Sequence, residues 1–161
     1  MRILGIDPGM AIVGYGVIDY DKDICGCESC KLVDSGSIQT SKNNTNAARL
    51  LEISQDLEFL IEKFKPDMAS VEKLFFFKNA KTVMPVAEAR GVILMTLEKY
   101  GIKTCEYTPL EVKQTITGYG RAEKEEVCQM VKILIGEENM PKLDDTTDAI
   151  AIALCQTRHC E

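Results

Sequence analysis

The order of the short apolar segments constrains the fold of this chain more than any other feature. Three strand-like segments come first, at residues 2–7, 12–19 and 31–39. Segments with helical spacing of apolar residues then alternate with short strand-like ones. The expected helices cover about 46–64, 81–99, 122–135 and 144 onward, and the expected strands cover 68–72 and 102–107. This order predicts an α/β fold: a mixed five-stranded sheet with helices on both faces.

Length and charge narrow the function classes without choosing one. The 161 residues suit one domain, 1–161. No apolar run approaches the length of a membrane helix, and the start MRILGID resembles a strand rather than a signal peptide, so we expect a cytoplasmic protein with no membrane partner. A net charge of -6 argues against a purely electrostatic DNA binder. It is compatible with a nuclease whose carboxylates hold cations.

The seven cysteines favour reduced thiols over disulfides or a zinc site. Their number is odd and most spacings are irregular, which fits a cytosolic protein. The run CGCESC at 25–30 offers three thiols, but a structural zinc site takes four ligands, and the single histidine, His159, is distant in sequence. We therefore expect loop thiols there.

Acidic residues stand at the ends of predicted elements. Asp7 ends the first strand, Glu72 ends a later one, and Asp145 and Asp148 begin the last helix three positions apart, on one helix face. Ends of adjacent strands lie side by side, so these side chains are predicted to converge. Clustered carboxylates are costly unless a cation neutralises them, and Mg²⁺ prefers oxygen ligands. Two such ions about 4 Å apart suit phosphodiester hydrolysis.

Each carboxylate taken alone also fits a structural role. Asp7 precedes Pro-Gly and is a common turn residue, and Glu72 fits a strand that leaves the core for solvent. Asp145 and Asp148 suit the first turn of a helix, where the macrodipole favours acids. The metal-site interpretation depends on the set: every candidate lies at the end of an element with an apolar body.

Four blocks of sequence, in order, extend the argument beyond single residues. They are GIDPGMAIVGYGV near the N-terminus, VEKLFFFKNAKTVMPVAEARG at 71–91, YTPLEVKQTITGYGRAEKEEVCQMV at 107–131, and DDTTDAIAIALC at 144–155. In content, order and spacing they resemble the RuvC family of crossover (Holliday) junction endodeoxyribonucleases. The resemblance runs nearly from end to end.

The resemblance implies an RNase H-like fold and a homodimer that nicks two symmetric strands of four-way DNA junctions in recombination and repair. It implies two Mg²⁺ ions per active site, with Mn²⁺ as a substitute, and the RuvA–RuvB branch-migration complex as a partner. Matched position by position, the metal-binding and catalytic carboxylates are Asp7, Glu72, Asp145 and Asp148. The two catalytic lysines fall on Lys113 and Lys124, and the aromatic residue that stacks at the junction falls on Phe75.

Basic residues after Glu72 are the predicted DNA contacts. The segment 73–90 is locally basic, and Lys73, Lys78 and Lys81 are expected to position phosphates, with Arg121 as a further contact. We expect Phe75 to be exposed for base stacking, worth about 1–3 kcal/mol. The alternatives are a solvated helix face for Lys81, a surface lysine paired with a nearby glutamate for Lys124, and core or dimer packing for the phenylalanines.

Three other function classes remain open at this point. An ATP-binding protein of the actin and sugar-kinase class also begins with a strand, an Asp and a Gly-rich turn, but needs about twice this length. A module that binds junctions without cutting them would not need all four acids. An RNase H-like enzyme that processes RNA shares the carboxylates, but the loop at 73–81 and the two lysines favour junction DNA.

Overall fold

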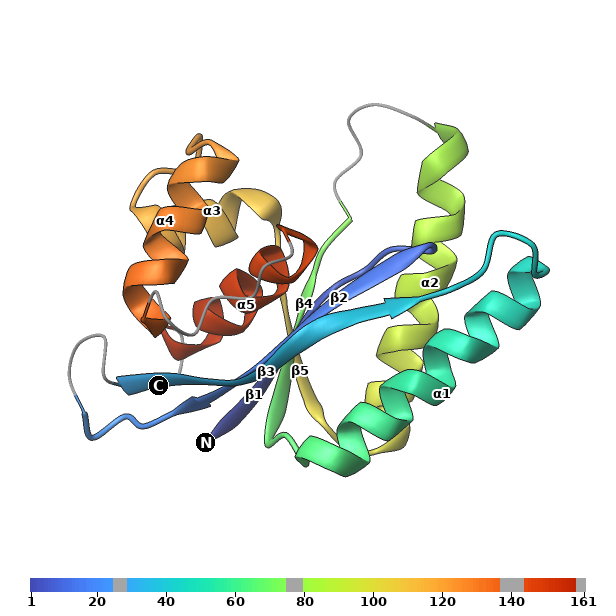
Figure 1. Ribbon diagram of the computed structural model, residues 1–161, viewed down its shortest axis with the longest axis horizontal. Coiled ribbons are helices and arrows are strands. Elements are labelled where there is room, and N and C mark those ends of the chain that lie inside the picture. Colours follow the sequence, from blue (N-terminus) through green and yellow to red (C-terminus); the bar gives the residue numbers. More distant parts are fainter. Residues whose placement is uncertain (25–28, 75–79, 137–143, 159–161) are drawn as a thin grey trace.

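A computed structural model shows a five-stranded sheet covered by helices (Figure 1). The structure describes residues 1–24, 29–74, 80–136 and 144–158, and at 80–82, 144 and 145 it describes the backbone only. The strands are β1 (Arg2–Asp7), β2 (Ile12–Tyr20), β3 (Cys30–Gln39), β4 (Met68–Glu72) and β5 (Lys103–Tyr107).

The sheet is mixed, and its order is β3-β2-β1-β4-β5. The first three strands form an antiparallel meander, in which Asp7 is opposite Gly14 at the end of β1. β4 then pairs in parallel with β1, and β5 pairs in parallel with β4. The carboxyl ends of β1, β4 and β5 therefore meet at one edge, which is where ligands bind in open α/β sheets.

Helices cover both faces of the sheet, as the sequence predicts. One face is covered by α1 (Asn46–Phe64) and α2 (Ala80–Lys99), and the other by α3 (Pro109–Thr117), α4 (Lys124–Ile135) and α5 (Asp144–Thr157) (Figure 1). Alternate residues of β1 enter the two cores: Leu4 and Ile6 pack against α1 and α2, whereas Ile3 packs on the α3–α5 side. By the same alternation, Asp7 and Glu72 belong to the α3–α5 face.

Two glycines let α5 lie directly on the sheet. A Cβ on Gly5 would be 2.1 Å from the backbone oxygen of Ala149, and one on Gly16 would be 2.8 Å from Cγ1 of Ile150. Glycine in a strand interior marks a close approach of another backbone. The missing side chains therefore set how near the first turns of α5 come to the ends of β1 and β4.

The element boundaries differ from the predicted ones by one or two residues at most. The largest difference is α4, which begins at Lys124 because Glu123 is its N-cap and forms a capping box with Glu126. Cys30, Cys105, Cys128 and Cys155 are free thiols, as expected. Cys25, Cys27 and His159 lie outside the described residues. Among the helices that the structure describes, none is long and apolar enough to cross a membrane.

Candidate active site

Asp7 and Glu72 end neighbouring parallel strands. The β1–β4 register pairs Ile6 with Val71, and each acidic residue is the next and last residue of its strand. Side chains one step beyond an in-register pair leave the sheet on the same face and at the same edge. The predicted convergence of these two residues therefore follows from the strand pairing itself.

Asp148 joins them from the first turns of α5, which the glycine contacts hold against β1 and β2. The pKa of Glu72 reports the proximity: burial, followed by the charges of Asp7 and Asp148, raises it from 4.5 to about 8. Two carboxylates from different elements thus act on a third that is largely removed from water. Asp145 lies on the same first turn, where the structure describes its backbone only.

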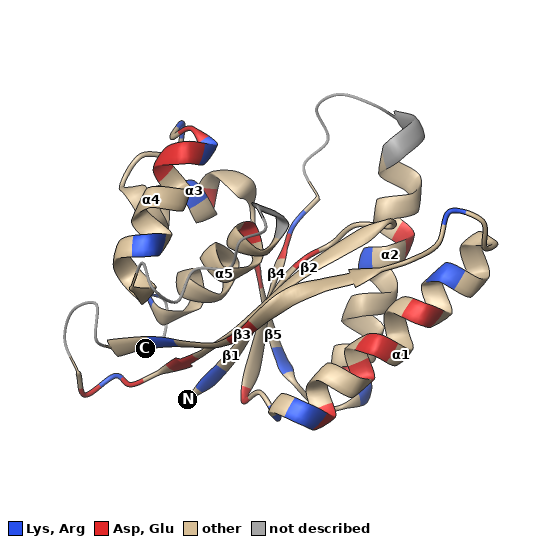
Figure 2. Ribbon diagram, in the orientation of Figure 1, with Lys and Arg blue, Asp and Glu red and all other residues tan. Residues whose placement is uncertain are grey.

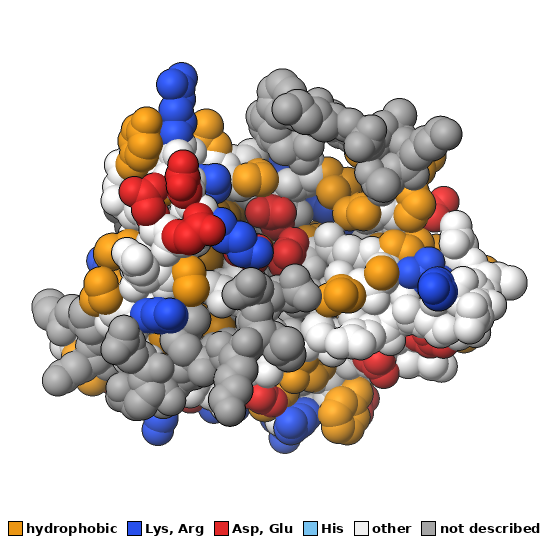
Figure 3. All heavy atoms as spheres, turned by 45° about the horizontal axis from the view of Figure 1, so that its top comes forward, with side chains coloured by type: hydrophobic (Ala, Val, Ile, Leu, Met, Phe, Trp, Pro, Cys, Tyr) orange, Lys and Arg blue, Asp and Glu red, His pale blue; other side chains and the backbone are white. Residues whose placement is uncertain are grey.

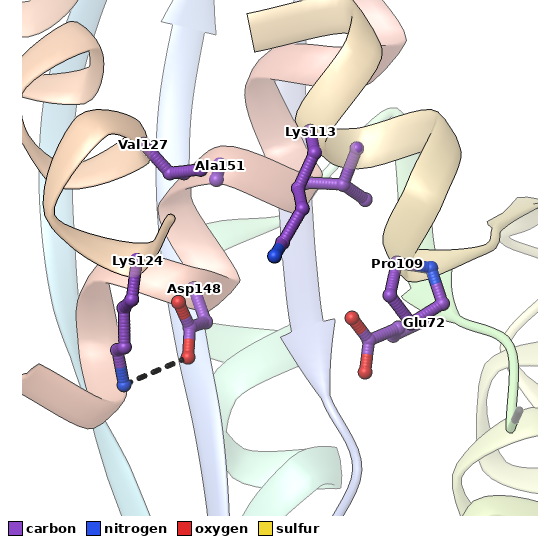
Figure 4. A pocket seen from close by; sticks show the side chains of 8 residues that line it. Glu72, Pro109, Lys113, Lys124, Val127, Asp148 and Ala151 are labelled. Carbon is purple, nitrogen blue, oxygen red and sulfur yellow. Dashed lines mark ion pairs between the residues drawn. The ribbon is translucent and has the colours of Figure 1, made fainter. Parts of the chain in front are cut away.

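A pocket of about 210 Å³ lies between the sheet edge and the three helices α3, α4 and α5. In Figure 3, acidic and basic side chains lie next to one another near the middle of the viewed face. Figure 4 shows the pocket from close by, with Glu72 on one side and Asp148 on the other. The lining residues are Glu72, Pro109, Val112, Lys113, Lys124, Val127, Asp148 and Ala151.

Both predicted lysines line this pocket, on different helices. Lys113 extends from α3 toward the space between Asp148 and Glu72, and its Nζ donates to the backbone oxygen of Ala122 at 2.7 Å (Figure 4). Lys124 is the first residue of α4, and its Nζ lies 3.2 Å from Oδ2 of Asp148. One ionic partner of Lys124 is thus a candidate active-site acid.

Local capping signals explain how α3 presents Lys113. Thr108 caps the helix by accepting from the Glu111 amide at 3.2 Å, and the Glu111 carboxylate accepts from the Thr108 amide at 2.7 Å. Pro109 occupies the first turn, where its missing N–H costs nothing. Gly118, with φ 78°, ends the helix in the left-handed conformation that favours glycine.

The charge balance of the pocket fits a hard divalent cation. Among the residues whose side chains are described, no three His, Cys, Asp or Glu side chains already form a ligand group for a metal. Glu72 holds its proton to about pH 8, because burial and neighbouring charges make its ionised form costly, and Asp148 pairs with Lys124. Carboxylate oxygens are the donors that Mg²⁺ prefers.

The structure describes the side chains of only some of the predicted DNA contacts. Lys73 and Arg121 are exposed. Phe75 and Lys78 lie outside the described residues, and Lys81 is in the first turn of α2, where only the backbone is described. Part of the acidic surplus lies along α1, which covers the face of the sheet opposite the pocket (Figure 2). Some of the negative net charge therefore lies away from the site.

Arg90, the last residue of the basic segment 73–90, is held by partners within the chain. Its side chain is only 19% exposed. Its Nε donates to the backbone oxygen of Glu72 at 3.1 Å, and its guanidinium pairs with Glu106 on β5. The sequence carried one signal, a basic residue inside the largely apolar stretch 86–97, but no indication of its partners.

Comparison with known proteins decides the family. The family model described as crossover junction endodeoxyribonuclease RuvC matches residues 3–156. The chain belongs to the RuvC family. This confirms the resemblance drawn from the four sequence blocks, and it favours a DNA endonuclease over the ATP-binding, non-cleaving and RNA-processing alternatives.

Individual relatives of this RuvC-family chain are similar over nearly its whole length. The crossover junction endodeoxyribonuclease RuvC of Petrotoga mobilis is 49% identical over 155 residues, covering 96% of this chain and 92% of that protein. The protein of the same description from Caldicellulosiruptor saccharolyticus is 47% identical, covering 96% and 91%. The solved structure of T. thermophilus RuvC in complex with a Holliday junction substrate matches with a TM-score of 0.87 at 31% identity, covering 96% and 92%.

More distant structures agree on the fold. The yeast mitochondrial Holliday junction resolvase Ydc2 has a TM-score of 0.69 at 19% identity, covering 97% of this chain and 78% of that one. Together with the T. thermophilus protein, it confirms the RNase H-like arrangement of sheet and helices expected from the resemblance.

Proposed function

We propose that this chain is a Holliday-junction resolvase, a structure-specific endonuclease that nicks two symmetric strands of a four-way DNA junction during recombination and repair. The observation that carries the proposal is the pocket that Glu72 and Asp148 share with Lys113 and Lys124, near enough to Asp7 for its charge to act on Glu72, in a member of an endonuclease family. A similar protein, T. thermophilus RuvC, has been solved with a Holliday junction substrate.

The carboxylates are proposed to hold two Mg²⁺ ions, with Mn²⁺ as a substitute. The ligands would be Asp7, Glu72, Asp145 and Asp148. The raised pKa of Glu72 supports a cation here, because burial and the charges of Asp7 and Asp148 make its ionised form costly unless a positive charge binds beside it. When bound, the ions would activate a water for attack and stabilise the leaving oxygen. Asp7 and Glu72 would be contributed by adjacent strands, and the two aspartates by one turn of α5.

The two lysines are proposed to stabilise the phosphate during cleavage. Fixed cations directed at a site of developing charge act strongly where water is excluded. Lys113 approaches from α3 and Lys124 from α4, so they would contact the scissile phosphate from separate elements. Val112, Val127 and Ala151 line the same pocket and limit its contact with water.

The DNA path and the assembly extend the proposal. Lys73 and Arg121 would contact phosphates beside the pocket, together with Lys78 and Lys81, and Phe75 would stack on a base at the branch point. We further propose that residues 1–161 act as one nuclease domain in a homodimer, so that two sites cut two strands, and that the RuvA–RuvB complex delivers the junction in the cytoplasm.

A nicking assay on a synthetic four-way junction tests the function. The chain is incubated with labelled junction, and with linear duplex of the same sequence, in Mg²⁺ or in chelator. We expect paired symmetric nicks in the junction alone, and only with Mg²⁺. Asp7→Asn should abolish cleavage while junction binding survives, whereas Asp56→Asn on the exposed surface of α1 should cut normally. Full cutting by Asp7→Asn, or equal cutting of linear duplex, would overturn the proposal.

A further inference from the structure

We infer that Arg90 is a positioning residue for cleavage: it fixes the peptide unit that follows Glu72 and so sets how the Glu72 carboxylate enters the site. Arg90 lies on α2, behind the sheet as seen from the pocket, and acts through the backbone of β4. The inference rests on the proposed function, because positioning is measured through the rate of junction cleavage.

The peptide unit between Glu72 and Lys73 is held at both of its polar groups. Its carbonyl oxygen, on Glu72, accepts from Arg90 Nε at 3.1 Å. Its N–H, on Lys73, donates to the backbone oxygen of Tyr107 at 2.7 Å. The β1–β4 register ends at Ile6 and Val71, whereas the β4–β5 register continues to Glu72 and Tyr107. Arg90 therefore supplies a hydrogen-bond partner for the Glu72 carbonyl where pairing with β1 has ended. Two opposed hydrogen bonds fix the orientation of this plane.

Arg90 is itself held rigidly enough to serve as an anchor. Its guanidinium pairs with Glu106, which lies opposite Val71 in the β4–β5 register. The neighbouring Ala89 is fully buried, which seats this turn of α2 on the sheet. A planar guanidinium can serve a carboxylate and a carbonyl at once in fixed directions, whereas a lysine ammonium cannot. The bridge thus joins α2, β4 and β5 at the edge where the pocket opens.

Loss of the Arg90 contacts should lower the rate of cleavage. Rotation of the peptide plane after Glu72 moves the Glu72 side chain. A misplacement of about 1 Å can cost about 100-fold in rate, and loss of an outer contact to a metal ligand typically costs about 10–100-fold. We therefore expect Arg90→Gln to slow cleavage by roughly 10–100-fold at saturating junction.

Glu106 distinguishes this role from a direct phosphate contact. If Arg90 bound DNA, Glu106→Gln would release its guanidinium and remove a negative charge, so junction affinity would rise. If Arg90 positions Glu72, Glu106→Gln removes the anchor and should slow cleavage as Arg90→Gln does. The two substitutions change the net charge in opposite directions, so a direct phosphate contact would change junction affinity in opposite directions. The positioning role instead predicts the same loss of cleavage rate from both substitutions.

The test compares Arg90→Gln, Arg90→Lys, Glu106→Gln and the Arg90→Gln/Glu106→Gln double variant. Single-turnover cleavage is measured at saturating protein, and junction affinity is measured in chelator at several salt concentrations. We expect slowed cleavage in both single variants, affinities within about twofold of the parent, and a double variant no slower than Arg90→Gln. Arg90→Lys should recover part of the rate at most.

Arg2 supplies the matched control. It also bridges a carboxylate and a backbone carbonyl, with Nε 2.8 Å from Asp19 and Nη1 2.9 Å from the Phe64 oxygen, but at the opposite end of β1. Arg2→Gln should therefore lower the melting temperature without slowing cleavage. If Arg90→Gln does not fold, Arg90→Lys and Glu106→Gln still carry the comparison.

Two results would overturn the inference. One is full cleavage rate in folded Arg90→Gln or Glu106→Gln. The other is weaker junction binding with a smaller salt dependence in Arg90→Gln, together with tighter binding in Glu106→Gln, which would make Arg90 a phosphate contact. If the parent cuts no junction, the proposed function fails, but Mg²⁺-dependent thermal stabilisation still tests the role of Arg90. Arg90→Gln should need a higher Mg²⁺ concentration than the parent for the same rise in melting temperature. An unchanged Mg²⁺ requirement would refute the positioning role.

Discussion

Glu72→Gln is expected to stabilise the metal-free protein while abolishing its proposed activity. Glu72 lies largely buried between the charges of Asp7 and Asp148, so its ionised form is costly without a cation. Glutamine has the same shape and no charge. The substitution removes the cost and also removes a proposed metal ligand.

The magnitude follows from the pKa of Glu72. Burial and the two aspartates raise it from 4.5 to about 8, a shift equivalent to roughly 5 kcal/mol. In the unfolded chain the carboxyl loses its proton near pH 4.5, whereas the folded chain keeps it to about pH 8. The free-energy cost of ionising Glu72 in the folded chain is therefore absent below about pH 4.5, grows as the pH rises, and is complete above about pH 8. Because the site relaxes and admits water, we expect a gain of about 2–4 kcal/mol at pH 8.5, or roughly 5–15 °C in melting temperature.

Thermal unfolding in chelator, followed by circular dichroism from pH 4 to pH 8.5, measures the effect. The parent and Glu72→Gln should melt together at the acid end and separate as the pH rises. Mg²⁺ should raise the melting temperature of the parent more than that of Glu72→Gln, because at a given concentration a ligand stabilises the protein that binds it more tightly by the larger amount. Glu98→Gln, at an exposed position of α2, is the matched control and should show no such separation.

The reasoning would be refuted if Glu72→Gln melted at or below the parent temperature at pH 8.5 in chelator. A gain that did not change with pH would also refute it, because the increase would then have a cause other than the Glu72 charge.

Three further predictions concern the scaffold and the DNA. Gly5→Ala should lower the free energy of unfolding by at least about 3 kcal/mol in denaturant titrations, because its Cβ would overlap the Ala149 oxygen at 2.1 Å. The hydrogen bond from Arg2 lowers the pKa of Asp19, so Asp19→Asn should cost under about 1 kcal/mol at pH 7, a difference that disappears as the pH falls through the folded pKa. Junction affinity should fall steeply with salt despite the net charge of -6, and a flat response in gel-shift assays would argue against phosphate contacts.

Most of the fold could be predicted because its signals are local. The helix at Asn46–Phe64 and the strand at Met68–Glu72 were predicted with their observed boundaries, since apolar spacing and the following Pro66 mark them directly. The positions of Asp7 and Glu72 at strand ends were local facts too. Their adjacency followed only once β1 and β4 were paired, and a single sequence does not state strand order.

The missed features depend on contacts between distant segments. Arg90 is 18 residues from Glu72 in sequence, and only the packing of α2 against the end of β4 brings its Nε to that backbone oxygen. Gly5 and Gly16 were visible as glycines within strands, a known sign of close approach, but the sequence did not identify α5 as the element that comes close.

The lysines and the proton on Glu72 suggest how the chain maintains an acidic pocket without a bound ion. Lys124 neutralises Asp148, and protonation neutralises Glu72 below about pH 8. A divalent cation bound at the same carboxylates would neutralise both of them, so the Lys124–Asp148 ion pair would no longer be needed and Lys124 could contact a phosphate at the pocket. Lys124 would then stabilise the fold when no metal is bound, and it would stabilise the reacting phosphate when metal is bound. Under this argument, Lys124→Gln weakens the metal-free protein and slows cleavage, whereas a lysine with a purely surface role would do neither.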